Sequence, residues 1–374
     1  CQRLGISGKL LASNDDARKR FVFSHGKLHK LPHNQIEFLT NSLISFKGKL
    51  RIATEFFVPQ RHASSDETLA DFTRRRLGAE ALNKLIAPMA GGIFAGDPEQ
   101  MSLQACFPRI YQLEQEYGGL LKAMLRLTRQ HHSDKKAGKV VASPAGPGGV
   151  LTSFSGGIQE LISALSDAIG RDNLIQTAAV DKISQLQNGQ WQVTAGNEVY
   201  AADKIVCATP AFASAAMLQD LDADLANSLQ KIKYAPLLVV CLGYAQTQIE
   251  ADLNGFGYLF ARGEDEALLG TLWDSSIFAA RAPAGKILLR SMLGGASHPQ
   301  VMNLDDQQIQ QLVQKSLTTT LGIKATPELV QIYRHVQAIP AYGLGLFITG
   351  NAYTGVGIND CVAAAVATAK QVLA

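Results

Sequence analysis

The sequence predicts an α/β fold class, and three of its features support that prediction. An amphipathic helical pattern over residues 158–169 is followed directly by segments whose apolar residues alternate with a period of two. Long apolar strands recur further along the chain, at 237–244 and 287–292. The chain ends with a short apolar strand, a glycine-rich turn and an Ala/Val-rich helix. Strands and helices that alternate in this way favour a mixed α/β architecture over an all-helical or all-strand one.

Length and composition set the scale of the protein and exclude one class of partner. The 374 residues, 47% of them hydrophobic, are enough for two or three domains with their own cores. Charged residues make up 18%, which is below the roughly 25% of an average soluble domain, so we expect an apolar-rich surface that suits a membrane face. The net charge of +3 is distributed along the chain in both signs, without the basic stripe that nucleic-acid binding requires.

Cysteine usage and hydropathy bear on the compartment. The five cysteines are scattered and form no C-x-x-C pair, so neither a zinc site nor a disulfide framework is predicted. No segment reaches the roughly 20 consecutive apolar residues that span a bilayer, and no basic-then-apolar signal peptide opens the chain. We therefore expect a cytoplasmic protein that is peripheral to the cell membrane rather than membrane-spanning.

The first part of the chain is expected to form a hairpin followed by helices. Apolar alternation on both sides of Ser24-His25-Gly26 predicts a β-hairpin that ends near Pro32. The character is helical from residue 34 to about 136, with one helix beginning at Thr68 and interrupted at Gly91-Gly92. A further helix is expected over 110–127. This helical block is the most separable unit of the chain.

The second part is expected to be richer in strands. The helix over 158–169 ends at Gly170, a typical helix-terminating glycine. An Asn188-Gly189 turn predicts a hairpin within a set of three short strands. Those strands are expected at 180–186, 191–194 and 204–208. An exposed helix over 305–321 follows the long strands, and a buried strand over 346–349 precedes the last helix.

The turn before the last helix, GNAYTGVGINDC at 350–361, is the strongest candidate for a ligand site. Gly350, Gly355 and Gly357 remove side chains where a large planar or anionic group could approach the backbone. The N-terminal N–H groups of the following helix, at the positive end of its dipole, would then face that group. An ordinary glycine-rich strand-to-helix turn explains the same pattern equally well.

The chain also resembles a known family, in segments that occur in one order. They are ARKRFVFSHGKLHKLP (17–32), TRRRLGAEALNKLIAPMAGG (73–92), GGIFAGDPEQMSLQACFPRIYQLEQEYG (91–118), FSGGIQEL (154–161), DKIVCATPA (203–211) and the glycine-rich turn. These segments resemble the protoporphyrinogen oxidase family, which lies within the larger group of amine-oxidase-like flavoproteins. The resemblance covers nearly the whole chain, and its GxFAGDP and GNAYxGVGIxDC strings are specific to porphyrinogen oxidases.

The resemblance implies that FAD is the cofactor and implies which residues contact it. Val180, Asn351, Val356, Gly357 and Ile358 match positions of the family that line FAD. Val180 matches the position at the adenine end, and the backbone at Val356 and Gly357 matches the part near the flavin ring. Without the resemblance, Val180 is equally well explained as a residue of a sheet core.

The resemblance further implies a site for a tetrapyrrole substrate. Arg20 matches an arginine placed to meet a substrate propionate, which suits the bidentate grip of a guanidinium on a carboxylate. Phe94, Ala95 and Gly96 match a stretch whose backbone faces the macrocycle. Taken alone, Arg20 is a solvated charge and the 94–96 stretch is a helix-terminating turn.

The implied activity is FAD-dependent oxidation of a porphyrinogen to the porphyrin, in heme biosynthesis. The substrate would be protoporphyrinogen IX or coproporphyrinogen III, and dioxygen the electron acceptor. Because the flavin carries the redox chemistry, we predict no catalytic side chain and no metal, and the protein is left to orient the substrate and exclude water. His335 and Tyr342 are the polar residues expected nearest the substrate strand. A membrane surface is a further expected partner, and a homodimer is left open.

The implied architecture is an FAD-binding amine-oxidase-like fold with three parts. A discontinuous FAD domain accompanies a mixed-sheet substrate domain and a helical membrane-associating domain. The expected boundaries are 1–33 for a remnant hairpin, 34–140 for the helical domain, 150–225 for part of the FAD domain, 230–342 for the substrate sheet and 343–374 for the C-terminal FAD-binding strand, turn and helix.

The sequence departs from the family's pattern in two places. The N-terminal Rossmann βαβ unit with its G-x-G-x-x-G turn is missing, and so is a helix expected after IPAY at 339–342. The chain could therefore be a truncated enzyme, a degenerate non-catalytic remnant that still binds porphyrin and membrane, or one of two polypeptides that complete each other. A generic amine-oxidase-like flavoenzyme is the remaining alternative, but no aromatic cage or acidic funnel supports it.

Overall fold

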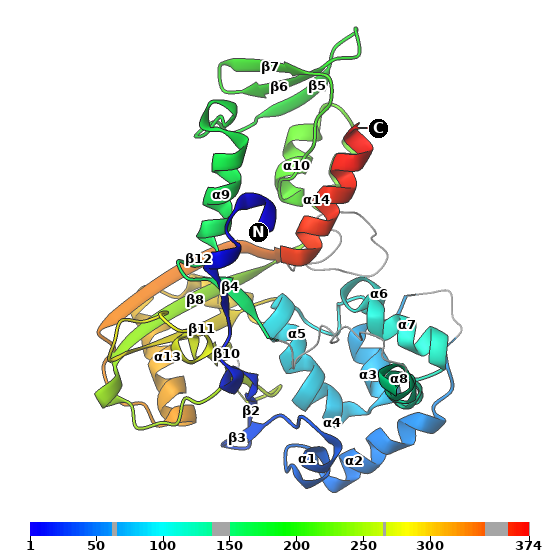
Figure 1. Cartoon of the computed structure of the whole chain (residues 1–374), viewed down its shortest axis with the longest axis vertical. Helices are drawn as coiled ribbons and strands as arrows, with labels where there is room; N and C mark the ends of the chain where they lie inside the picture. The colour runs from blue at the N-terminus through cyan, green and yellow to red at the C-terminus, as the bar shows by residue number, and fades with distance from the viewer. Residues whose placement is uncertain (62–65, 137–149, 265–266, 341–357, 374) are drawn as a thin grey trace. The chain divides into compact units, whose positions relative to one another are not determined.

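A seven-stranded mixed sheet is the centre of the larger of two structural units (Figure 1). The computed structural model describes residues 1–61, 66–136, 150–264, 267–340 and 358–373. The larger unit comprises Lys9–Ser155 and Ala235–Ala338. The smaller unit comprises Cys1–Gly8, Gly156–Tyr234 and Ile339–Ala374.

The order of the sheet brings distant parts of the chain side by side. From edge to edge the strands are β12 (Leu329–Pro340), β8 (Tyr234–Ala245), β11 (Lys286–Gly294), β10 (Leu268–Leu272), β9 (Gly257–Phe260), β2 (Arg20–Ser24) and β3 (Lys27–Lys30). β2 pairs with β9 in parallel, and the neighbouring pairs from β8 to β9 and from β2 to β3 are antiparallel. The mixed sheet confirms the predicted α/β class.

One face of this sheet packs against helix α13 (Asp306–Leu321), which begins after the N-cap Asp305 and ends at Gly322. Ile309, Val313 and Leu317 of α13 are 0% exposed and belong to the main hydrophobic core. The predicted bounds of this helix are confirmed. Its expected exposure is wrong, because its apolar stripe is fully covered by the sheet.

The β2–β3 hairpin confirms the sequence prediction and has a clear local cause. His25 and Gly26 both have positive φ, at 50° and 71°. Two consecutive residues of positive φ are typical of the turn whose twist matches a two-residue hairpin. The turn is therefore encoded locally, within the sequence around Ser24-His25-Gly26.

Residues 35–136 form the expected helical region. Its helices are α1 (Gln35–Thr40), α2 (Phe46–Ala53), α3 (Leu69–Arg76), α4 (Ala79–Ala81), α5 (Ala87–Phe94), α6 (Leu103–Cys106), α7 (Pro108–Tyr117) and α8 (Leu120–Lys136). The start of α3 after Thr68 agrees with the prediction, since the Thr68 hydroxyl accepts a hydrogen bond from the Asp71 N–H.

Three details of the helical prediction are wrong. The helix expected from Thr68 to the Gly91-Gly92 pair ends at Arg76, and a new helix begins after Gly78, which has a φ of 95°. Helix α5 continues through Gly91 and Gly92, because these glycines let it approach β9 and β10 closely: a Cβ on Gly92 would lie 2.9 Å from Cδ1 of Leu259. The helix expected over 110–127 is instead two helices, α7 and α8, separated at Gly118, which has a φ of 74°.

A buried ion network holds α3, α7 and α8 together. Arg76 of α3 donates to Glu55 at 2.8 Å and to Glu114 of α7 at 2.6 Å, and the three side chains are 0%, 0% and 2% exposed. The Glu55 carboxylate also accepts hydrogen bonds from the backbone N–H groups of Leu120 and Leu121, both at 2.9 Å. Glu55 therefore binds both the buried guanidinium and the first turn of α8.

Short elements complete the larger unit. Strand β1 (Leu10–Ala12) pairs with β4 (Thr152–Phe154) in an antiparallel ribbon. Helix α12 (Asp274–Ile277) follows β10 directly and packs against β11. The side chain of Arg281 reaches the ribbon, donating to the Ser153 hydroxyl at 2.7 Å and the Phe154 carbonyl at 3.1 Å.

Among its described residues, the smaller unit contains a three-stranded meander and four α-helices. The strands are β5 (Lys182–Gln185), β6 (Trp191–Ala195) and β7 (Glu198–Ala202), and the helices are α9 (Gln159–Ile169), α10 (Ala211–Leu218), α11 (Ala223–Gln230) and α14 (Ile358–Leu373). The expected strand at 204–208 is wrong: these residues form no strand, and a strand needs a neighbour to pair with. The expected strand at 346–349 lies outside the described residues.

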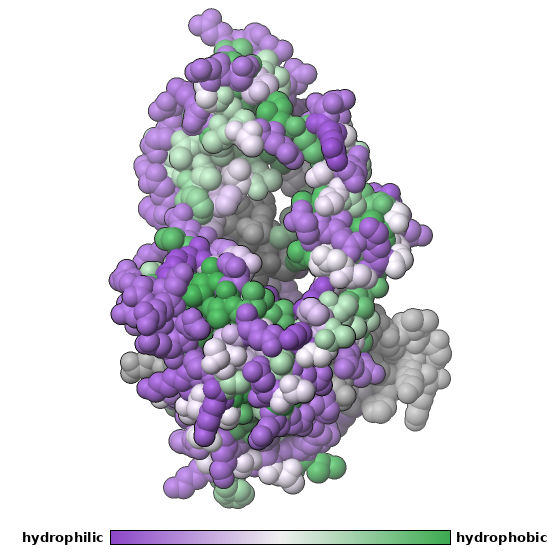
Figure 2. Space-filling model, turned by 90° about the vertical axis from the view of Figure 1, so that its left-hand side faces the viewer, coloured by the Kyte–Doolittle hydropathy of each residue, from purple (hydrophilic) through white to green (hydrophobic). Residues whose placement is uncertain are grey.

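Much of the apolar surface of the smaller unit is accessible. The predicted stripe of α9 is present but exposed, with Ile158, Ile162, Leu165 and Ile169 between 42% and 51% exposed. Val362 and Val366 of α14 are similarly exposed, at 54% and 50%. Figure 2 shows hydrophobic residues gathered in patches among hydrophilic ones on the face that it presents. These observations agree with the low charged fraction of the sequence.

Candidate functional site

The two faces of the seven-stranded sheet differ in burial. Four alternate residues of β8 point toward α13 and are at most 1% exposed: Leu238, Val240, Leu242 and Tyr244. The residues that alternate with them, Leu237, Val239, Cys241 and Gly243, point to the opposite face and are half-buried. This opposite face, here called the open face, is covered by α5 over part of β9 and β10, but at β8 and β11 it presents half-buried apolar surface that a large ligand could cover.

The strand register places one row of residues across five strands of the open face. The row, here called the arginine row, consists of Arg20 on β2, Gly257 on β9, Leu272 on β10, Arg290 on β11 and Cys241 on β8. Residues directly opposite each other on paired strands share a face. Arg20 and Arg290 thus lie on the same face, three inter-strand spacings apart, which is about 14 Å.

Arg20 is a half-buried cation without a carboxylate partner among the described residues. Its guanidinium carbon lies 4.8 Å from the centre of the Phe256 ring. Its Nε atom is buried and has no hydrogen-bond partner. Burial lowers the pKa of the guanidinium, although arginine remains charged. A half-buried guanidinium without a carboxylate partner is suited to an incoming carboxylate, which it would bind through its Nη groups rather than through the covered Nε.

Arg290 is held by a neighbouring acid. Its Nη2 donates to Oδ1 of Asp274 at 2.8 Å, and the two side chains are 41% and 13% exposed. Burial raises the pKa of the Asp274 carboxyl, and the charge and hydrogen bond of Arg290 oppose that rise. The Arg290 Nε is buried without a partner. Sequence reasoning missed this pair, whose signal is an arginine inside the apolar strand KILLRSML.

The Phe94-Ala95-Gly96 stretch forms the end of α5. Ala95 adopts the left-handed conformation with a φ of 48°, and its carbonyl accepts a hydrogen bond from Ala296, just beyond β11, at 2.7 Å. Phe94 is 7% exposed and packs edge-on against Phe107, with ring centroids 5.4 Å apart. All three residues of this stretch are therefore buried, and the N–H and carbonyl of Ala95 both have backbone partners.

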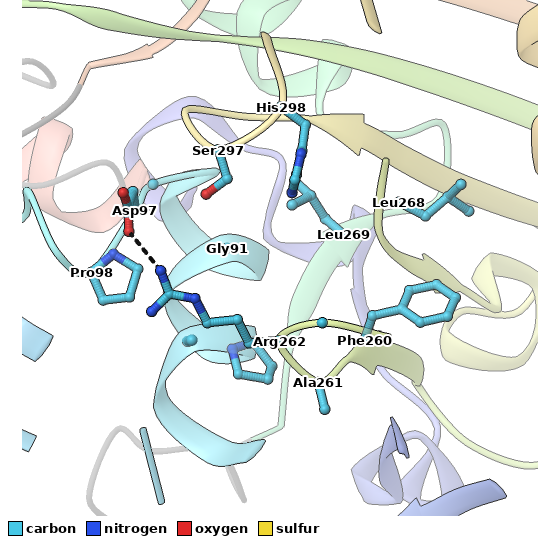
Figure 3. A pocket seen from close by; sticks show the side chains of 14 residues that line it. Gly91, Asp97, Pro98, Phe260, Ala261, Arg262, Leu268, Leu269, Ser297 and His298 are labelled. Atoms are coloured by element: carbon cyan, nitrogen blue, oxygen red, sulfur yellow. Dashed lines mark ion pairs between the residues drawn. The ribbon is translucent and has the colours of Figure 1, made fainter. Parts of the chain in front are cut away.

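A small cavity lies beside Gly96. It is lined by residues of α5, the 96–98 loop, the end of β9 and the 297–298 turn, and its volume is about 90 Å³. Figure 3 shows the Arg262 side chain directed toward Asp97, at an N–O distance of 3.9 Å. Arg262 also pairs with Glu99 at 2.8 Å. The cavity is smaller than the roughly 300 Å³ at which drug-sized ligand pockets begin, so it cannot enclose a macrocycle.

The structure does not bring all the predicted substrate residues into one pocket. Arg20 pairs with Gly257 at the beginning of β9, whereas the cavity beside Gly96 is lined by residues from Phe260 to Gly263, at and beyond the end of that strand. Three residues of strand separate Gly257 from Phe260, which is about 10 Å. The open face, rather than the small cavity, is the surface that Arg20 shares with other half-buried residues.

The predicted cofactor residues lie in the smaller unit. Val180 precedes β5 and is 39% exposed, and Ile358 is the first residue of α14 and is 50% exposed. Asn351, Val356 and Gly357 lie outside the described residues. Exposed apolar side chains at Val180 and Ile358, together with the positive end of the dipole of a 16-residue helix, fit a large planar cofactor that carries phosphates.

Other chemistries lack support in the described part of the chain. No group of three or more His, Cys, Asp or Glu residues there could hold a metal ion. His335 lies on β12 and is exposed, and Tyr342 is outside the described residues. Within the described residues, no helix is both long enough and apolar enough to cross a bilayer.

Comparison with known proteins defines the class. The family model of flavin containing amine oxidoreductases matches residues 1–373. The chain therefore belongs to the flavin containing amine oxidoreductase family. It is an FAD-dependent oxidoreductase with the fold of that family, as predicted.

Within that class, the chain is similar to porphyrinogen oxidases. It is 28% identical to protoporphyrinogen oxidase 1 of Spinacia oleracea, over 97% of this chain and 70% of the relative. It is 27% identical to coproporphyrinogen III oxidase of Bacillus subtilis, over 96% of this chain and 80% of the relative. It is also 28% identical to human protoporphyrinogen oxidase, over 99% of this chain and 83% of the relative. The predicted resemblance is confirmed.

Solved structures support the same fold. A crystal structure assigned as a protoporphyrinogen oxidase from Exiguobacterium sp. 255-15 matches with a TM-score of 0.81 and 23% identity, covering 99% of this chain and 83% of that one. Cyclohexylamine oxidase from Brevibacterium oxydans matches with a TM-score of 0.63 and 15% identity, covering 100% and 85%. At these identities the likeness establishes the architecture alone.

Proposed function

We propose that this protein oxidises a porphyrinogen to the porphyrin in heme biosynthesis, with FAD as cofactor and dioxygen as electron acceptor. The substrate is protoporphyrinogen IX or coproporphyrinogen III. The observation that carries the proposal is Arg20, a half-buried cation with an unused donor on the open apolar face. A flat apolar molecule with carboxylate arms has the chemistry that this face and this cation would bind together.

The described residues would bind and orient rather than react. Half-buried apolar residues of β8, β10 and β11 would support the plane of the macrocycle, and Arg20 would fix its rotation through a propionate. When bound, FAD supplies the redox chemistry by accepting hydride from the macrocycle and passing the electrons to dioxygen. This division of labour requires no acid–base pair from the protein.

In the test, each porphyrinogen is prepared under anaerobic conditions and added to the purified protein, and air is then admitted. We expect flavin absorbance bands in the protein and a rise of porphyrin fluorescence above the spontaneous rate. A colourless protein that binds porphyrin without accelerating its formation would contradict catalysis and identify a non-catalytic porphyrin-binding remnant. Oxidation of amines instead would identify a generic amine-oxidase-like flavoenzyme.

We further propose that the protein is cytoplasmic and peripheral to the cell membrane, attached through its first helices. Highly exposed apolar side chains are concentrated between residues 36 and 57. They are Ile36 at 76%, Leu39 at 66%, Phe46 at 81%, Leu50 at 59% and Phe57 at 81%. Amphipathic elements with exposed Phe and Leu bind the interfacial region of a bilayer, and here they fall in α1, α2 and the turn that follows them (Figure 1).

A further inference from the structure

We propose that Arg290 is a second carboxylate-binding residue of the open face and that it selects porphyrinogens with propionates on opposite sides of the macrocycle. This proposal rests on the proposed function, and it names the substrate class. Coproporphyrinogen carries a propionate on every pyrrole ring, whereas protoporphyrinogen carries propionates only on two neighbouring rings. The two substrates therefore differ in whether a carboxylate can reach both arginines at once.

The positions of the two arginines carry the first step. Arg20 and Arg290 belong to the arginine row and lie on β2 and β11, with β9 and β10 between them. Three inter-strand spacings separate them, which is about 14 Å. They share a face, so a flat molecule laid on the sheet between them would meet one guanidinium at each of two opposite edges. Carboxylates confined to one edge would meet only one.

The residues between the arginines carry the second step. Gly257 has no side chain, and its φ of 127° together with the carbonyl of Thr271, which would lie 2.2 Å from a Cβ there, excludes any other residue. Leu272 is half-buried and apolar. Gly257 is itself buried, so no charged side chain of the row stands between the two cations.

The state of Arg290 carries the third step. A guanidinium has five N–H donors, and the described residues supply one acceptor to it, Oδ1 of Asp274. Its Nε is buried without a partner, although 41% of the side chain is exposed. Asp274 thus orients Arg290 and leaves donors for a second carboxylate. A purely structural ion pair would leave the protein indifferent to the number of propionates on its ligand.

The test measures binding rather than turnover, so it does not depend on the loaded enzyme. Coproporphyrin III and protoporphyrin IX, the stable oxidised forms, are titrated into the purified protein, and the quenching of tryptophan fluorescence gives each Kd. The variants are Arg290→Gln, Arg20→Gln and, as a matched control, Lys286→Gln. Lys286 is on the same strand and pairs with Glu328 at 2.5 Å at the far end of β11.

We expect Arg290→Gln to weaken coproporphyrin III binding by about tenfold, the usual effect of losing a charge-assisted hydrogen bond. Protoporphyrin IX binding should stay within about twofold. Arg20→Gln should weaken both ligands, and Lys286→Gln neither. Thermal melting of each variant shows whether the fold is retained. If Arg290→Gln is unstable, Arg290→Lys replaces it in the test, because it keeps the positive charge and should retain part of the coproporphyrin III affinity.

Two failures are distinguishable. If the unmodified protein binds both porphyrins and Arg290→Gln changes both affinities equally, or neither, the role of Arg290 is refuted while the proposed function stands. If the unmodified protein binds neither porphyrin, the proposed function is refuted, and this inference with it.

Discussion

Arg20 is the residue on which the proposed function depends most. Its sequence neighbours, Arg18 and Lys19, are also cationic, and nothing in the sequence alone distinguishes the three. The structure does: Arg18 pairs with Asp15 at 3.0 Å and is 45% exposed, whereas Arg20 lies over Phe256 with an unused buried donor. Burial converts an ordinary surface charge into a specific site for an anion.

We predict that Arg20→Gln lowers kcat/KM for porphyrinogen oxidation by about tenfold to a hundredfold, because a charge-assisted hydrogen bond contributes about 1.5–3 kcal/mol. Steady-state fluorescence assays measure the change. Arg18→Gln is the control, since it also removes one positive charge, two residues away from Arg20, and Arg18 belongs to an exposed ion pair with Asp15. Equal rates for the two variants would mean that Arg20 does not contact the substrate.

At the scale of elements, the buried network around Arg76 stabilises the junction of α3, α7 and α8. We predict that Arg76→Met lowers the free energy of unfolding by about 3–5 kcal/mol, because Glu55 would remain buried without a counter-charge and Glu114 would keep only Arg75 as a partner. Urea denaturation measures this. Arg74→Gln, at an exposed pair with Asp71, should change stability by about 1 kcal/mol or less. A similar loss in both variants would exclude a special role for burial.

The exposed side chains of the first helices lead to a prediction on membranes. Phe46→Ser together with Phe57→Ser should reduce cosedimentation with anionic phospholipid vesicles by about tenfold or more, since each buried aromatic side chain contributes about 1.5–3 kcal/mol. Val336→Ser is the control, because Val336 is 70% exposed but lies on β12. Equal vesicle binding by both proteins would place the contact elsewhere.

Local elements could be predicted from the sequence, and the pairing of distant ones could not. The hairpin at Ser24-His25-Gly26 and the helix after Asp305 follow from turn and capping residues within a few positions. The arginine row joins positions 20, 257, 272, 290 and 241, and its register is set by pairing between segments that lie from 15 to more than 200 residues apart. The same limitation explains the wrong strand at 204–208, whose composition suits a strand that has no partner in the described residues.

The candidate site divides in the same way. Arg20 and the 94–96 stretch were found through family motifs, which are local strings. Arg290 and Asp274 were missed, because their significance lies in a face that exists only once five strands are paired. An arginine at the centre of an apolar strand was the signal available, and it should be read as a buried or ligand-facing cation.

At the scale of the whole molecule, the ion network predicts a pH dependence. Burial raises the pKa of Glu114, but hydrogen bonds from Arg75 and Arg76 outweigh it and leave the pKa below its usual value. A carboxyl with a depressed pKa in the folded state stabilises the protein above the unfolded value, about 4.3 for glutamate. That stability is lost as the pH falls from there through the folded pKa.

We therefore predict that Arg75→Gln moves the acid unfolding transition to higher pH, since it removes bonds to Glu114 at 3.0 Å and 3.1 Å. Circular dichroism during acid titration measures the midpoint. Arg129→Gln, on the exposed surface of α8, is the control for loss of a charge. An unchanged midpoint in Arg75→Gln would show that the network does not control acid stability.

The parallel pairing of β2 with β9 also has a consequence for synthesis of the protein. Phe23 of the N-terminal hairpin pairs in register with Phe260, so its final neighbour leaves the ribosome more than two hundred residues later. At translation rates of about 5–20 residues per second, the hairpin waits for tens of seconds beside an incomplete sheet. An apolar strand that stays unpaired for this time can associate with other nascent chains. The yield of folded protein in the cell should therefore depend on chaperones that cover the strand until translation is complete.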